Sequence, residues 1–149
     1  MAEWSIIPPS KPEHWDAYFN LRYEMLRKPW GEEVGSEHAD DDETSMHGMI
    51  VNKKREVLAV GRIHVSAPDQ AQVRFMAVRG DMHGLGLGKT LLHYLEHRAQ
   101  KEIPSLIQIM LHAREYAVPF YEKQGYLLID KSYSLFGRIQ HFRMIKTLL

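Results

Sequence analysis

Residues 83–90, HGLGLGKT, place three glycines at alternate positions directly before a helical stripe of leucines. An apolar run over residues 72–78 precedes this loop and is typical of a β-strand, and a second such run over 106–111 follows the helix. Two neighbouring strands joined by a helix lie parallel, because the crossover returns the chain to the same end of the sheet. The sequence therefore predicts one parallel strand pair in the middle of the chain.

The rest of the chain predicts antiparallel strands around this central unit. A helical stripe lies within the first 30 residues, and a second one ends at Gly125. In the strand over 72–78, the period-two pattern places Val73, Phe75 and Ala77 on one side. Further strands are expected at 46–52, 57–65, 126–134 and 138–147, besides one at the N-terminus. The order β–α–loop–β–β–β–α–β–α–β–β indicates a mixed α/β fold and not a doubly wound parallel sheet.

One long loop is predicted at residues 31–45, GEEVGSEHADDDETS, which are polar and show no period. The acidic run Asp40–Glu43 within it could attract a cationic substrate, such as a polyamine or a lysine side chain. The same run is also typical of a solvated loop with no role in binding. The sequence leaves both interpretations open.

Composition removes several classes of protein from consideration. The 149 residues suit one domain, expected to span residues 1–149, and the 19 basic and 19 acidic residues cancel. A nucleic-acid-binding protein usually has a basic excess, and no apolar run approaches the roughly 18 residues of a membrane-spanning helix. The chain contains no cysteine, which excludes disulfides and thiolate ligands and fits a cytoplasmic location. We therefore expect neither nucleic acid nor a membrane as a partner.

The glycine loop does not have the spacing of the two common nucleotide-binding motifs. A Walker loop ending at Gly88-Lys89 would need a glycine at position 83, where this chain has His83. The alternation Gly-x-Gly-x-Gly also differs from the Gly-x-Gly-x-x-Gly of dinucleotide folds. Glycines at a helix start still allow backbone amides to hold an anion such as a pyrophosphate, with added charge from Lys89, His83 and Arg79. Alternatively, the glycines only permit a tight strand-to-helix turn.

Two segments carry a resemblance to a known family. Residues 75–96, FMAVRGDMHGLGLGKTLLHYLE, resemble the acyl-CoA motif of the GNAT superfamily of N-acyltransferases, [Gln/Arg]-x-x-Gly-x-[Gly/Ala]. Gly86 and Gly88 occupy its glycine positions, whereas His83 stands where Gln or Arg is usual. Residues 111–126, LHAREYAVPFYEKQGY, are similar to the second signature of the same family. Together with the closing strand IQHFRMIKTL, the resemblance covers residues 46–149.

This resemblance implies a fold, a cosubstrate and a set of binding residues. The fold is a mostly antiparallel sheet, flanked by helices, in which the central parallel pair splays apart. The cosubstrate is acetyl-CoA, whose pyrophosphate the glycine loop would grip and whose pantetheine arm would add to the strand before the loop. Similar proteins are often homodimers. The residues implied for coenzyme A are Met76, Ala77, Val78, His83, Gly84, Leu85, Gly86, Leu87, Gly88, Lys89, Arg114, Ala117 and Tyr121.

The resemblance also implies a proton donor for the reaction. Tyr121 matches the position that commonly protonates the coenzyme A thiolate, and a phenol is adequately matched to a thiol leaving group. The alternative is that Tyr121 is a core aromatic of a helix stripe. The backbone amide of Val78 is expected to polarise the thioester carbonyl.

Several residues are candidates for the general base. Some relatives carry a glutamate near the start of the strand before the glycine loop, but this chain has Gln72 there, and an amide cannot accept the proton. We favour Glu37 or His64 as catalytic residues in its place, acting directly or through water, with His38 and His112 as further candidates. The amine could also lose its proton to solvent before it binds.

The resemblance implies an N-acetyltransferase that acts on a primary amine of a small molecule or peptide, and two other functions compete with it. Gln72 keeps open a non-catalytic acyl-CoA-binding module of the same fold, whereas Tyr121 favours the enzyme. A P-loop hydrolase is disfavoured by His83 and by the lack of a parallel core. No metal is expected, because His93 and His97 lack the intervening acid and third ligand of zinc motifs.

Overall fold

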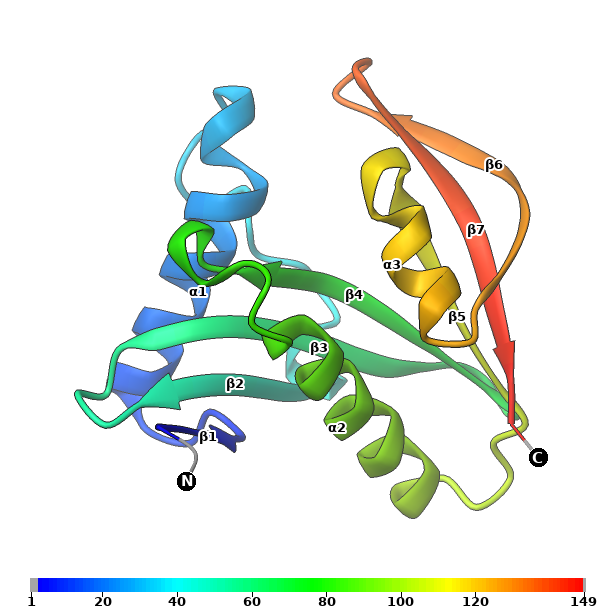
Figure 1. Cartoon of the computed structure of the whole chain (residues 1–149), viewed down its shortest axis with the longest axis horizontal. Helices are drawn as coiled ribbons and strands as arrows, with labels where there is room; N and C mark the ends of the chain where they lie inside the picture. The colour runs from blue at the N-terminus through cyan, green and yellow to red at the C-terminus, as the bar shows by residue number, and fades with distance from the viewer. Residues whose placement is uncertain (1–2, 149) are drawn as a thin grey trace.

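A seven-stranded sheet with the strand order β1-β2-β3-β4-β5-β7-β6 forms the centre of the computed structural model, which describes residues 3–148 (Figure 1). The strands are β1 (Trp4–Ile7), β2 (Met46–Asn52), β3 (Val57–Ala67), β4 (Gln70–Val78), β5 (Gln108–Arg114), β6 (Leu127–Leu135) and β7 (Ile139–Thr147). The helices are α1 (Pro12–Leu26), α2 (Leu87–Glu102) and α3 (Val118–Lys123). The predicted mixed α/β class and the predicted order of elements are confirmed.

One pair of neighbouring strands, β4 and β5, is parallel, and the other pairs are antiparallel. The parallel pairing covers only Gln70–Val73 of β4 and Gln108–Leu111 of β5. Beyond these residues β4 continues along β3, whereas β5 continues along β7, so the two strands diverge (Figure 1). The expected splay of the central pair is confirmed, and it begins after Val73.

The two faces of the sheet carry different helices. Helix α1 packs on one face through a cluster that includes Tyr18, Leu21 and Leu26. Helix α2 covers the other face with the predicted leucine stripe, which is fully buried at Leu91, Leu92 and Leu95. Each helix therefore buries its apolar stripe against β3 and its neighbours, which holds β4 in place and leaves its splayed end free to line a cavity.

A bulge in β4 changes which side chains share a face. Between Arg74 and Ala77, β4 has one residue more than the matching stretch of β3, and Phe75 has a φ of 57°. As a result, Val73 packs on the α2 side of the sheet, whereas Phe75 and Ala77 pack on the α1 side. The expectation that these three residues share one face is wrong, because one extra residue reverses the alternation of the strand.

The predicted long loop contains a short 3₁₀ helix at Asp42–Thr44 and is tied to the sheet by ion pairs. Arg22 and Arg62 are fully buried, and both guanidinium groups bind the carboxylate of Asp42, at 3.0 and 2.9 Å. Asp41 binds Arg62 at 2.7 Å. Asp42 is therefore neither solvated nor free to attract a cation, whereas Asp40 and Glu43 of the same run are exposed.

No helix within residues 3–148 combines the length and the apolar character that a membrane crossing requires.

Candidate active site

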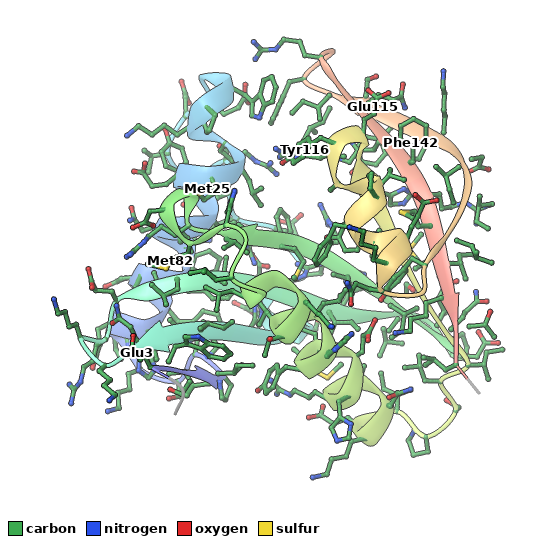
Figure 2. All side chains as sticks on the ribbon, in the orientation of Figure 1. Glu3, Met25, Met82, Glu115, Tyr116 and Phe142 are labelled. Atoms are coloured by element: carbon green, nitrogen blue, oxygen red, sulfur yellow. The ribbon has the colours of Figure 1, made fainter. Side chains whose placement is uncertain are left out.

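The divergence of β4 from β5 opens a cavity of about 140 Å³, which we call the splay cleft. The end of α1, both diverging strands, α3 with the 3₁₀ helix before it, and the β6–β7 hairpin supply its walls. In Figure 2, Tyr116 lies beside α3 on the side that faces α1. The lining residues are Leu26, Arg27, Gln72, Val73, Arg74, Phe75, Met76, Leu111, His112, Ala113, Arg114, Tyr116, Ala117, Tyr121, Tyr133, Leu135 and His141.

The glycine loop forms the N-terminus of α2. Gly86 is the N-cap residue with a φ of 79°, a backbone conformation that residues with a side chain rarely adopt. No side chain caps the helix, so its first amides are available to an anion, and the helix dipole favours negative charge there. A Cβ atom at Gly88 would lie only 3.4 Å from the ring of Phe120 and 3.6 Å from Val78. The start of α2 therefore packs closely against α3 and the end of β4.

The end of β4 offers a backbone amide on its open side. The amide of Arg79 donates to the carbonyl of Leu58 on β3, so strand alternation turns both backbone groups of Val78 away from β3. The carbonyl of Val78 accepts a hydrogen bond from Nε2 of His83 at 2.9 Å, which closes the loop on itself. Its amide faces the gap that β5 has left. Val78 therefore has the orientation that a strand-like ligand or an oxyanion requires.

The residues predicted to bind coenzyme A fall into three groups. Four of them, Met76, Arg114, Ala117 and Tyr121, line the splay cleft. Two others, Ala77 and Leu87, have buried side chains and offer only their backbone. The remaining residues form the end of β4 or the glycine loop, namely Val78, His83, Gly84, Leu85, Gly86, Gly88 and Lys89.

Tyr121 lies in the wall of the cleft. Its ring packs edge to face against Phe120 and Tyr126, with centroid distances of 5.0 and 5.8 Å, and only 9% of the residue is exposed. Burial raises the pKa of the phenol well above its ordinary value, and the nearby Tyr116 adds to this effect. Tyr121 is therefore protonated at neutral pH and can donate a hydrogen bond into the cleft.

The cleft does not include the two residues favoured as the general base. Oε1 of Glu37 accepts the amide of Gly35 at 2.7 Å, and the carboxylate is buried in the loop. His64 faces Arg62, whose Nη2 lies 3.1 Å from the imidazole Nδ1, and burial followed by this arginine lowers the pKa of His64. Neither residue lines the splay cleft, whereas Gln72 does. The structure therefore brings Tyr121 together with Gln72 but not with Glu37 or His64.

Two histidines line the cleft, and the sequence patterns identified only one of them as a candidate base. His141 donates from Nδ1 to the carbonyl of Ile139 at 2.9 Å, which leaves Nε2 as the acceptor, and its ring stacks on Tyr133 at 4.5 Å. Burial lowers the pKa of His141 below its ordinary value. His112 also has a lowered pKa through burial and Arg143, and its buried Nδ1 has no partner among residues 3–148. Both imidazoles are therefore neutral near pH 7.

His141 was missed because its place in the cleft depends on pairing between β5 and β7. In that pairing it lies opposite Arg114, a residue of the second signature. The sequence signal that could have found it is the alternation of the closing strand, in which His141 and Arg143 share one face.

Among the described residues 3–148, no group of three or more His, Asp or Glu side chains could hold a metal ion. His93 and His97 are exposed on α2.

Comparison with known proteins agrees with this geometry. Residues 24–148 match the family model described as the acetyltransferase (GNAT) domain. The fold is similar to that of a Lactobacillus plantarum protein assigned as an N-acetyltransferase, with 21% identity, a TM-score of 0.85, and coverage of 99% of this chain and 100% of that one. Escherichia coli ElaA shares 18% identity at a TM-score of 0.81, over 98% of this chain and 99% of that one. An aminoglycoside 6'-N-acetyltransferase complexed with coenzyme A shares 16% identity at a TM-score of 0.79, over 100% of this chain and 98% of that one.

Proposed function

Because this chain belongs to the GNAT acetyltransferase family, we propose that it transfers an acetyl group from acetyl-CoA to a primary amine of a small molecule or peptide. One observation carries the proposal. The glycine loop starts α2, where a Cβ at Gly88 would touch Phe120, and the next residue, Tyr121, lines the cleft that opens where β4 separates from β5. An anion site next to a protonated acid is what an acyl-CoA-dependent transfer needs.

The chain's own residues fit coenzyme A. The uncapped amides at the start of α2, with Lys89 beside them, would hold the pyrophosphate. The pantetheine arm would run along β4 at Met76, Ala77 and Val78, where β5 no longer occupies the edge. This position would direct the acyl end of the cosubstrate to the splay cleft, which Tyr121 lines.

Acetyl-CoA supplies an activated thioester, and this chain's own residues would catalyse the transfer of its acetyl group. The amine nitrogen forms a bond to the acetyl carbon as the carbon–sulfur bond breaks, and the electron pair goes to sulfur. The amide of Val78 would stabilise negative charge on the carbonyl oxygen. The hydroxyl of Tyr121 would donate its hydrogen to the departing sulfur.

For the general base we propose His141. Its Nε2 carries the lone pair, it is neutral near pH 7, and it lines the same cleft as Tyr121. Glu37 and His64 stay candidates only through a water relay, since neither lines the cleft. His112 is the direct alternative, because its Nδ1 has no partner among the described residues.

Release of free thiol from acetyl-CoA, measured across a panel of primary amines, tests the proposed function. We expect thiol release that depends on both the amine and the enzyme, with one acetyl group appearing on the amine per thiol. Tight binding of acetyl-CoA in calorimetry without turnover on any amine would instead favour the non-catalytic binding module that Gln72 keeps open.

A cytoplasmic location and a homodimer complete the proposal. The apolar side chains of Leu127, Leu128 and Ile129 are exposed on β6, one of the two edge strands of the sheet, and a second copy would cover them. Sedimentation equilibrium that finds only monomer at micromolar concentration would contradict the dimer.

A further inference from the structure

Three arginines, Arg27, Arg74 and Arg114, line the splay cleft, and its walls contain no aspartate or glutamate. We propose that the acceptor amine carries an anionic group, a carboxylate or a phosphate, which these three guanidinium groups hold. The inference rests on the proposed function and names the substrate class of that site.

Of the three cleft arginines, Arg74 has the charge that neighbouring groups compensate least. Its guanidinium lies 4.5 Å from the ring centre of Phe75, and among residues 3–148 it has neither a hydrogen-bond partner nor an ion-pair partner. Its pKa is lowered, first by burial and then by the neighbouring Arg62. A half-buried cation without a counter-ion is costly, and an anionic ligand would offset that cost.

Arg27 and Arg114 are positioned by neutral acceptors. Arg27 donates to the carbonyl oxygens of Ser36 and Leu26, at 3.1 and 3.2 Å, and Arg114 also donates to Leu26 at 3.2 Å. Backbone carbonyls fix these guanidinium groups at the end of α1 without cancelling their charge. The pKa of Arg27 is lowered by burial, and next by Arg114 and Arg74, which reflects repulsion among the three cations.

The contrast with the neighbouring arginines shows that this lack of counter-ions is local. Arg22 and Arg62 lie nearby, and Asp41 and Asp42 pair with them. Asp41 and Asp42 therefore form their ion pairs with other arginines, and Asp41 and Glu32 offset the charges of Arg74 and Arg27 only from a distance, without an ion pair. The other ionisable groups of its walls add no negative charge near pH 7, since His112 and His141 have lowered pKa values and the pKa of Tyr121 is raised.

The size and shape of the site suit a small anionic head group. A cavity of about 140 Å³ is similar to one that holds a benzene molecule, on the order of 150 Å³. Guanidinium groups bind carboxylate and phosphate oxygens through two parallel hydrogen bonds, which fixes orientation as well as charge. The same cleft would repel a polyamine or another polycation.

Matched pairs of acceptors test the inference. The pairs are 4-aminobutanoate with 4-aminobutanamide, and 2-aminoethyl phosphate with 2-aminoethanol, and 1,4-diaminobutane serves as the cationic amine. We expect kcat/KM for the anionic member to exceed that of its neutral partner by about tenfold or more, since a hydrogen bond to a charged group has this strength. The two pairs separate carboxylate from phosphate. Equal values within each pair, or a preference for the diamine, would overturn the inference.

A variant series assigns the preference to the cleft. Arg74→Gln should reduce the ratio of kcat/KM for the anionic amine to that for its neutral partner by about tenfold. Arg74→Lys keeps the charge but lacks the two parallel N–H donors of a guanidinium, so it should give an intermediate ratio. Arg55→Gln is the matched control, because Arg55 also has no carboxylate partner among residues 3–148 but lies in the β2–β3 turn, outside the cleft. An unchanged ratio in Arg74→Gln and Arg114→Gln, with both proteins folded by circular dichroism, would also overturn the inference.

Binding measurements separate this inference from the proposed function. In calorimetry with coenzyme A present, 4-aminobutanoate should bind more tightly than its amide even if no turnover is detected. Tighter binding of 4-aminobutanoate without thiol release would contradict the proposed enzyme activity and support the anion site. Thiol release with every amine at similar efficiency would support the proposed enzyme activity and contradict the anion site.

Discussion

The ring of Tyr121 packs between Phe120 and Tyr126, while the residue also lines the splay cleft. Burial raises its pKa far above that of a thiol, which is near 8.5 in free cysteine. The phenol therefore keeps its proton until negative charge develops on the departing sulfur. The packing and the chemistry use different parts of the residue, so they can be separated by removing the oxygen alone.

Replacing Tyr121 by phenylalanine should lower turnover by about 10²-fold, the contribution expected of a lost general acid. The affinity for acetyl-CoA and the unfolding midpoint should change little, because the ring stays in its packing site. Steady-state kinetics, calorimetry and thermal denaturation measure the three quantities. Tyr94→Phe on α2 is the matched control, since Tyr94 does not line the cleft. Turnover within a factor of about three of the unmodified enzyme would make Tyr121 a purely structural residue.

The second prediction at the residue scale concerns the pH profile. His141 must be neutral to accept a proton, and its pKa lies below 6.5 through burial. The enzyme is therefore active above this pKa, and kcat/KM falls as the pH drops through it. We expect log kcat/KM to show a break below about pH 6.5. His141→Gln should remove that break and lower kcat by about 10²-fold.

The exposed His97 on α2 provides the control, and His97→Gln should keep the profile. If the break persists in His141→Gln and disappears in His112→Gln, His112 is the base instead.

At the scale of elements, the start of α2 and the end of β4 form one unit. At the start of the helix Gly88 faces Phe120 and Val78, and the left-handed conformation of Gly86 turns the chain into the helix. The two elements thus direct their free amides toward the same side of the sheet. Since the amides and not the side chains would bind the ligand, histidine at position 83 is compatible with the motif. Its imidazole closes the loop on Val78.

Substitution of Gly86 by leucine should weaken acetyl-CoA binding by at least about tenfold, because a side chain at this position strains the loop and obstructs the anion. Calorimetry measures the affinity. Gly31→Leu is a matched control, because Gly31 has a φ of 75° against 79° for Gly86, and neither has an atom within 4 Å of an added Cβ. Both variants should lose similar stability, about 1–2 kcal/mol for the left-handed conformation. Equal loss of acetyl-CoA affinity in both would contradict a role for the glycine loop.

At the scale of the whole molecule, a buried ion cluster joins α1, the 31–45 loop and β3. Arg22 comes from α1, Arg62 from β3 and Asp42 from the loop. Tyr18 and Phe75 stack against the guanidinium of Arg22, at 5.1 and 4.1 Å from it. The cluster fixes the end of α1, from which Arg27 reaches the splay cleft.

Asp42→Asn should destabilise the protein by about 3–5 kcal/mol, since it leaves two buried guanidinium groups without their shared carboxylate. The free energy of unfolding in urea measures the loss. Glu43→Gln, the next residue in the chain, is the control, because Glu43 is exposed and takes part in no ion pair among the described residues. A difference of less than about 1 kcal/mol between the two variants would show that the cluster contributes no more than a surface pair.

The sequence by itself determined the elements, their order and the parallel pair. Each of these depends on local patterns: the period of apolar residues, the glycines before a helix, and the length of a crossover. The motif residues Gly86, Gly88 and Tyr121 were likewise identified in the sequence, through its resemblance to the two GNAT motifs, and their roles stay predictions.

Only the tertiary structure decided which side chains meet in the cleft. The bulge at Phe75 moved the alternation of β4 by one residue, and the pairing of β5 with β7 put His141 opposite Arg114. The acidic side chains of the loop form ion pairs with Arg22 and Arg62, so the three arginines of the cleft have no ion-pair partner among the described residues. Such contacts join residues that are far apart in the chain, as in the hydrogen bond from Arg114 to the carbonyl of Leu26, which is 88 positions away. No local pattern encodes them, because they depend on strand register and on competition among charges in the folded chain.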